Sequence, residues 1–200
     1  PQGAWPPVKF IGTSSMRGQG DHHIPLAVIK GVPYLVGANE LRCSAFPRLF
    51  DISDETNLRA VGEFRLESND RCLSDPEWAK ANAAGNYGLH YNDVVDNAWG
   101  NVALGMFNFM GSGLRVVDLR DPTRPREVAY YHPGAPSAPP APAGGEASRR
   151  PAPVVDSCMS HNYFVHETNQ IWFSCTSGFY IAELSPAVKS YLGVKTESRR

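Results

Sequence analysis

Residues Gly113–Tyr131, GLRVVDLRDPTRPREVAYY, carry the clearest signal of the fold. Its first part, Leu114–Leu119, is rich in β-branched and aliphatic residues and predicts a strand. Two aspartates and Pro122 then supply turn chemistry, because an aspartate can bond its own downstream backbone and a proline pre-sets φ. Glu127–Tyr131 resumes as a strand. The predicted unit is therefore a strand, a tight turn and an antiparallel strand.

The same unit occurs elsewhere in the chain. LFDISD at 49–54, followed by LRAVGEF at 58–64, matches it closely, and GFYIAELSP at 178–186 is a weaker copy. The recurring acidic residues are Asp51, Asp118 and Glu183, and the two intervals between them are nearly equal. Repetition at a near-constant period predicts a repeat architecture. We interpret the recurrent carboxylates as caps of the turns that follow them.

A histidine opens a strand pair upstream of each copy. His23 precedes Asp51 by the same interval at which His90 precedes Asp118, and the interval from His161 to Glu183 is shorter. The strand pairs expected after these histidines are 27–29 with 33–37, 90–95 with 102–107, and 161–165 with 171–175. Turns are expected at 30–31, around 96–97 and at 167–170.

Each copy therefore predicts four short antiparallel strands, which is the pattern of a propeller blade. The strands are apolar on both faces, as sheets stacked between neighbours should be. We expect an all-β fold of about three β-propeller blades. Three blades do not close a ring, since propellers have about 4–8 blades. The missing blades are expected on another segment of the same precursor or on another chain.

The strand Leu114–Asp118 with the following Asp121 and Pro122 resembles the repeat of the LVIVD-repeat β-propeller proteins. The first copy fits that pattern fairly, and the third departs from it because Glu183 replaces the aspartate and no closing strand is obvious. The resemblance covers about residues 20–185. It implies a propeller fold and a surface or secreted protein; much of that family has no assigned biochemical activity.

The chain divides by composition. The blades are expected at about 20–64, 87–132 and 154–185, with insertions at 65–86 and 133–153. Residues 1–19 form a lead-in with a candidate outer strand of a preceding blade, and 186–200 form a polar tail. In the first insertion Ser74, Pro76 and Glu77 predict a short helix at about 75–83 that Gly85 ends. The second insertion is rich in proline and alanine and predicts an extended loop.

Charge and hydropathy exclude some partners. Lys and Arg number 19 against 20 Asp and Glu, so the balance gives no support for a nucleic-acid partner. The apolar runs are too short for a transmembrane segment. No signal peptide is recognisable, and Pro1 is not a natural start, so the chain is expected to be processed or trimmed.

The four cysteines fit none of the close-paired zinc patterns. We predict two disulfides within repeats, Cys43–Cys72 and Cys158–Cys175, in an oxidising compartment. The protein is therefore expected to be secreted, periplasmic or on the cell surface. The alternative is four buried free thiols, since cysteine behaves as a small hydrophobe.

The histidines at the start of the blades are the candidate site. The first strand of a blade lines the propeller channel, so His23, His90 and His161 are expected to converge, with His22 and Asp93 as further ligands and His166 and Glu40 as additions. Convergent imidazoles suit a transition metal such as copper or zinc, or a structural ion. The alternative is structural: each ring bonds a backbone carbonyl of the neighbouring blade.

Two classes of function follow. The first is a binding or scaffold module with a protein partner, in which the rigid blades present the two insertions. The second is a metalloenzyme, of the oxidase or hydrolase type, with the ion in the central channel. No nucleophile motif and no phosphate-binding glycine loop is present, so the catalytic residues are unknown.

Overall fold

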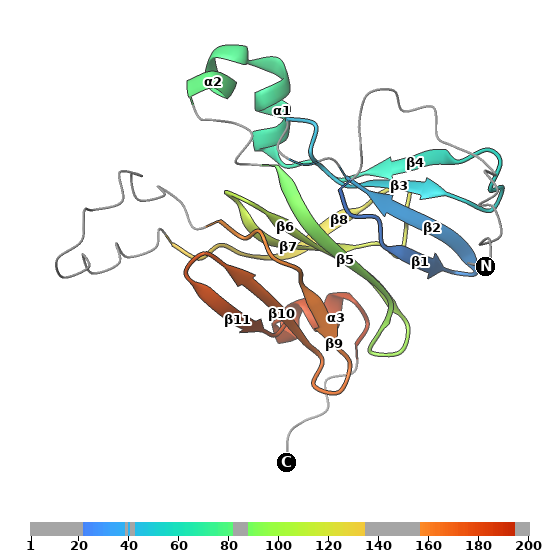
Figure 1. The fold of residues 1–200 in the computed structure, drawn as a ribbon. Coiled ribbons are helices and arrows are strands. Elements are labelled where there is room, and N and C mark those ends of the chain that lie inside the picture. Colours follow the sequence, from blue (N-terminus) through green and yellow to red (C-terminus); the bar gives the residue numbers. More distant parts are fainter. Residues whose placement is uncertain (1–21, 39, 41–42, 82–87, 135–156, 195–200) are drawn as a thin grey trace, which may run out of the picture.

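The computed structural model describes residues 22–38, 40, 43–81, 88–134 and 157–194. They form three separate antiparallel sheets, two of four strands and one of three (Figure 1). The strands of the first sheet are β1 (Leu26–Ile29), β2 (Val32–Gly37), β3 (Arg48–Asp51) and β4 (Arg59–Glu63). Those of the second are β5 (Leu89–Ala98), β6 (Val102–Phe109), β7 (Gly113–Asp118) and β8 (Arg126–Tyr131). Those of the third are β9 (Tyr163–Val165), β10 (Gln170–Cys175) and β11 (Gly178–Ala182).

The predicted all-β fold with propeller-like blades is therefore confirmed. Each sheet follows chain order, so its first strand lies at one edge and its last at the other. The prediction of four strands in every copy is wrong for the third sheet, where β11 leads into a helix and no closing strand occurs among the described residues. The lead-in 1–19 and most of the insertion 133–153 lie outside the described residues.

The hairpins β1–β2 and β5–β6 each turn on a consecutive pair of residues with positive φ. Lys30 and Gly31, at the predicted turn, have φ of 52° and 82°, the pattern of a tight two-residue hairpin loop. The second hairpin was expected around 96–97, but β5 continues to Ala98 and the chain turns at Trp99 and Gly100, with φ of 49° and 89°. Glycine adopts this backbone conformation without the steric penalty that a Cβ would bring.

The recurrent aspartates cap the turns that follow them, as predicted. The Oδ1 atom of Asp51 accepts a hydrogen bond from the Ser53 backbone N–H at 2.9 Å, and that of Asp118 accepts one from the Arg120 backbone N–H at 3.0 Å. Burial by itself would raise the pKa of Asp118, but the hydrogen bonds and charge of the Arg120 guanidinium outweigh it and lower that pKa.

The middle sheet is covered on both faces. Every residue of β6 is buried. Phe107 and Val117 belong to a core shared with the first sheet, and Met106 and Val116 belong to a core shared with the third. Strands that are apolar on both faces are thus explained by stacking between two neighbouring sheets.

The helices differ from the prediction of one helix at 75–83. Two helices, α1 (Glu67–Ser74) and α2 (Pro76–Ala81), occupy the first insertion, and Gly85 lies outside the described residues. The cap of α2 is Asp75, whose Oδ1 accepts a hydrogen bond from the Trp78 N–H at 2.9 Å. The expected polar tail begins with a third helix, α3 (Pro186–Tyr191), capped by the Ser185 hydroxyl. In the described part of the chain, no helix is long and apolar enough to cross a membrane.

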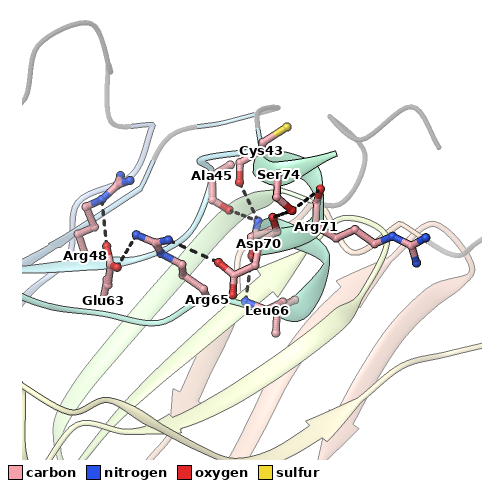
Figure 2. A network of polar contacts seen from close by, with 10 residues as sticks. Cys43, Ala45, Arg48, Glu63, Arg65, Leu66, Asp70, Arg71 and Ser74 are labelled. Carbon is pink, nitrogen blue, oxygen red and sulfur yellow. Dashed lines mark hydrogen bonds and ion pairs between the residues drawn. The ribbon is translucent and has the colours of Figure 1, made fainter. Parts of the chain in front are cut away.

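Both predicted disulfides are present. Cys43 is bonded to Cys72 and Cys158 to Cys175. The first ties α1 to the segment before β3, where charged side chains add a chain of contacts: Arg48 pairs with Glu63, Glu63 with Arg65, and Arg65 with Asp70 (Figure 2). The Asn69 amide also donates to the Cys43 carbonyl at 3.2 Å. The insertion is therefore fixed to the first sheet.

The first strands of the three sheets lie next to one another. β1 contacts β5, and β5 contacts β9 (Figure 1). The backbone N–H of Val28 in β1 donates to the Asp96 carboxylate in β5 at 2.9 Å. This is the arrangement in which first strands line a propeller axis, and it brings together the residues at their N-terminal ends.

Candidate functional site

Four histidine rings surround the ring of Tyr91 at the N-terminal ends of these first strands. The ring centroid of Tyr91 lies 4.6 to 5.7 Å from those of His22, His23, His90 and His161. His22 and His23 precede β1, His90 and Tyr91 lie in β5, and His161 precedes β9. The predicted convergence of imidazoles from all three repeats therefore occurs.

Two of these histidines are anchored to the next repeat. The Nδ1 atom of His22 bonds the His90 carbonyl oxygen at 3.3 Å, and that of His90 bonds the Met159 carbonyl oxygen. A carbonyl oxygen only accepts, so each Nδ1 carries a proton. His22 and His90 therefore have the structural role given above as the alternative, in which a ring bonds a backbone carbonyl of the neighbouring blade. The Nε2 atom of each ring is left available for another partner.

Glu40 faces both of the available Nε2 atoms. Its carboxylate lies 2.9 Å from the Nε2 of His90 and 3.7 Å from the Nε2 of His22. One ligand atom of each of the three residues lies within 4.8 Å of the other two. The set is two imidazoles and one carboxylate, and its residues come from the segments before β1, after β2 and in β5.

His23 and His161 form a second pair beside the first set. Their Nε2 atoms are 3.2 Å apart. The Nδ1 of His23 bonds the Asn92 amide oxygen at 3.1 Å, and the Nδ1 of His161 bonds the Asn162 carbonyl oxygen at 3.1 Å. Both acceptors again place the proton on Nδ1, so the two Nε2 lone pairs face each other.

A positive charge would stabilise both the contact of Glu40 with the imidazoles and the contact between His23 and His161. Two neutral Nε2 lone pairs repel each other, and a neutral Nε2 lone pair also repels a carboxylate. A proton or a cation between the groups removes that repulsion. Two nitrogen ligands of one tetrahedral zinc ion, each at about 2.0–2.1 Å, are about 3.3 Å apart. The 3.2 Å between the Nε2 atoms of His23 and His161 is compatible with this spacing. The bonds of the Nδ1 atoms are those that orient metal-bound histidines.

Two further predicted ligands, Asp93 and His166, differ in whether they interact with this site. Asp93 follows Tyr91 in β5, and burial raises the pKa of its carboxyl group above the ordinary value, although the Val94 N–H and the charges of His161 and His23 act in the opposite direction. His166 is exposed and contacts Phe164, with ring centroids 5.1 Å apart. Asp93 is therefore a neighbour of the histidine pair, whereas no contact joins His166 to the four rings in the described part of the chain.

The predicted triad His23, His90 and His161 does not occupy equivalent positions in the sheets. The strand registers instead match His23 with Tyr91 and His161. The loop between the first two strands is longer in the second sheet than in the first, and the connection between the second and third strands is shorter. These two differences nearly cancel. The equal histidine-to-aspartate intervals of the two copies therefore hide a shift of one position. His90 consequently pairs with His22 and Glu40, and His23 pairs with His161.

Sequence reasoning missed Tyr91 and did not give Glu40 its role. Tyr91 was overlooked because a histidine precedes it, although it fills the repeat position of two histidines. Glu40 follows β2 and was predicted only as an addition to the histidines.

Three buried asparagines, which the sequence did not single out, hold the repeats together. Asn92 donates to the Val36 carbonyl, Asn108 to that of Ser160, and Asn162 to that of Met106.

A separate cleft of about 420 Å³ lies between the first and middle sheets. Its lining includes Asp96, Asp118 and Asp121. Each of these carboxylates already accepts a hydrogen bond from the protein, from Val28, Arg120 and Thr123 respectively. The cleft therefore offers a weaker ligand set than the histidines.

Comparison with models of known families finds no matching family, and comparison with curated proteins finds no significant match. The resemblance to LVIVD-repeat proteins therefore stays a prediction.

Proposed function

We propose that this protein is a β-propeller-type binding module that holds a transition metal ion, copper or zinc, through His22, Glu40 and His90. The observation that carries this proposal is the position of Glu40, whose carboxylate faces the Nε2 atoms of two imidazoles. Both imidazoles are already oriented by bonds from Nδ1 to backbone carbonyls. A cation at this point can bind all three groups.

His23 and His161 form a second pair of imidazoles next to this site. Their facing Nε2 atoms offer two more nitrogen ligands beside Tyr91. Copper and zinc both accept imidazole nitrogen, and zinc also accepts a carboxylate. The two disulfides support a protein that works in an oxidising compartment, and we infer that it is secreted, periplasmic or on the cell surface.

Calorimetric titration of the metal-free protein with Zn²⁺ or Cu²⁺ tests the proposal. We expect saturable binding, and we expect His22→Ala and Glu40→Gln each to weaken it by at least about tenfold, because even a partner that only orients a ligand is worth about 10–100-fold in metal affinity. His166→Ala is the matched control, since His166 is an exposed histidine of the same chain outside the site. Absence of stoichiometric uptake, or equal loss in the control, would reject the site.

A metalloenzyme of the oxidase or hydrolase type is the second candidate function. It is favoured by the number of ligands in the first set, because catalytic zinc sites commonly have three protein ligands and one open position. Adding azide to the copper-loaded protein tests for an open position. A shift of the copper absorption bands is expected for such a site, and an unchanged spectrum would argue against it.

A further inference from the structure

Among the described residues, the two end sheets each have one exposed apolar face, and these faces point in opposite directions. On the first sheet, the alternating residues Ile24, Leu26 and Val28 are exposed, and we call them the rear face. On the third sheet, one register row crosses all three strands at Tyr163, Trp172 and Ile181, and Phe179 lies on the same side. We call these four residues the front face. Leu26 and Ile181 are 58% and 56% exposed, and each lies among other exposed apolar residues, so each belongs to an apolar patch.

The repeat itself shows what normally covers these faces. The register positions that correspond to Leu26 of the first sheet are Val94 in the second and Phe164 in the third. Val94 and Phe164 are only 9% and 8% exposed, because the preceding sheet packs on them. The rear face of the first sheet is therefore the surface that receives a preceding sheet elsewhere in the molecule.

The same comparison holds for the front face. Val36 in the first sheet and Met106 in the second correspond to Trp172 in the third. Val36 and Met106 are completely buried by the sheet that follows them, whereas Trp172 is only partly buried. The front face of the third sheet thus corresponds to the surface that, in the first and second sheets, packs against the rear face of the following sheet.

We propose that a second copy of this chain covers both faces: the front face of each copy packs on the rear face of the other, and the two copies close a ring of six sheets. Two copies related by a twofold axis make this contact twice, so neither face remains open. Six sheets fall within the range of about 4–8 blades of known propellers, whereas three do not reach it and nine exceed it.

Closure in this way also encloses the histidines. The ring of Tyr163, in the front face, stacks on His161 with centroids 4.8 Å apart. Ile24, in the rear face, directly follows His22 and His23. Both contact faces therefore begin at the candidate metal site, and the first strands of the second copy would line the other side of the same channel. The contact faces themselves contain no metal ligand, so this proposal is independent of the proposed function.

Light scattering after size-exclusion chromatography of the full chain, in chelator, tests the proposal. One chain has a mass of 21.9 kDa, and we expect a particle of twice that mass at a concentration of about 50 µM. Leu26→Asp and Ile181→Asp should each give a monomer. A mixture of the two variants should form dimers again, because one of the two contacts in the mixed pair is free of substitutions.

Leu73→Asp is the matched control, because Leu73 is an exposed leucine on α1 outside both faces. This variant should keep the mass of the wild-type particle. Circular dichroism of all three variants shows whether each one is folded. A wild-type monomer, a ladder of particles larger than a dimer, or a dimer that survives both Leu26→Asp and Ile181→Asp would overturn the proposal.

Discussion

The middle and third sheets have similar strands but differ in what covers them. In β6 of the middle sheet every residue is buried, whereas in β10 of the third sheet buried residues alternate with partly exposed ones. Both strands are apolar along most of their length. The difference therefore comes from position in the stack and not from hydrophobicity. A strand that is apolar on both faces can pack between two sheets, although among the described residues only the middle sheet packs on β10.

The largest expected effect compares a core residue of the middle sheet with a front-face residue of the third. Phe107 is completely buried and stacks on Phe64, with ring centroids 6.3 Å apart. Phe107→Ala should lower the free energy of unfolding by about 3–5 kcal/mol, because it removes buried surface and leaves a cavity. Ile181→Ala, made in the Leu26→Asp background where the front face is open, should change it by no more than about 0.5 kcal/mol.

Urea unfolding followed by fluorescence measures both changes. Equal losses for Phe107→Ala and Ile181→Ala would mean that the third sheet is covered as well as the middle one. The assignment of the front face would then be wrong.

A smaller effect on the free energy of unfolding is expected at Asp118 of the middle sheet, whose counterpart in the third sheet is Glu183. Asp118 is buried, and its carboxylate bonds the guanidinium of Arg120 at 2.7 to 3.1 Å. Asp118→Asn should cost about 1.5–3 kcal/mol at neutral pH, the range for a hydrogen bond to a charged group. Because the pKa of Asp118 is lowered in the folded state, this contribution is present above about pH 4, the ordinary value of an aspartate, and is lost as the pH falls through the lowered value.

The measurement is the free energy of unfolding of wild type and Asp118→Asn between about pH 2 and 7. The two curves should approach each other in acid. Curves that stay parallel over that range would show that the charge of Asp118 contributes nothing and that only the shape of its side chain matters.

Much of the fold could be predicted because its signals are local. The hairpin at Lys30 and Gly31 and the aspartate turns at Asp51 and Asp118 depend on residues within a few positions of one another. The disulfides could be predicted from the repeats, since Cys43 and Cys72 flank the last two strands of the first copy and Cys158 and Cys175 both lie in the third. Apolar strands repeated at a near-constant period then left stacked sheets as the simplest arrangement.

The histidine site shows where such prediction stops. Convergence of histidines was predictable, because equivalent ends of first strands meet near one axis. Their pairing was not, because two changes in loop length cancel almost completely and hide the one-residue shift that sets Tyr91 beside His23 and His161. Glu40 reaches His22 and His90 only through the packing of the first sheet on the second, and no local signal records that contact.

The smallest expected effect is at Glu183, the counterpart of Asp118 in the third sheet. Glu183 accepts a hydrogen bond from the Gln170 amide at 3.1 Å, and its carboxylate lies 3.8 Å from the Lys189 ammonium. The Glu183 side chain is 41% exposed, so solvent screens this ion pair. Glu183→Gln should therefore lower the free energy of unfolding by less than about 0.5 kcal/mol at pH 7 and low salt, and the loss should shrink further as salt is added. A loss as large as that of Asp118→Asn would mean that the third repeat depends on its acidic residue as the second does, although the described residues give it only three strands.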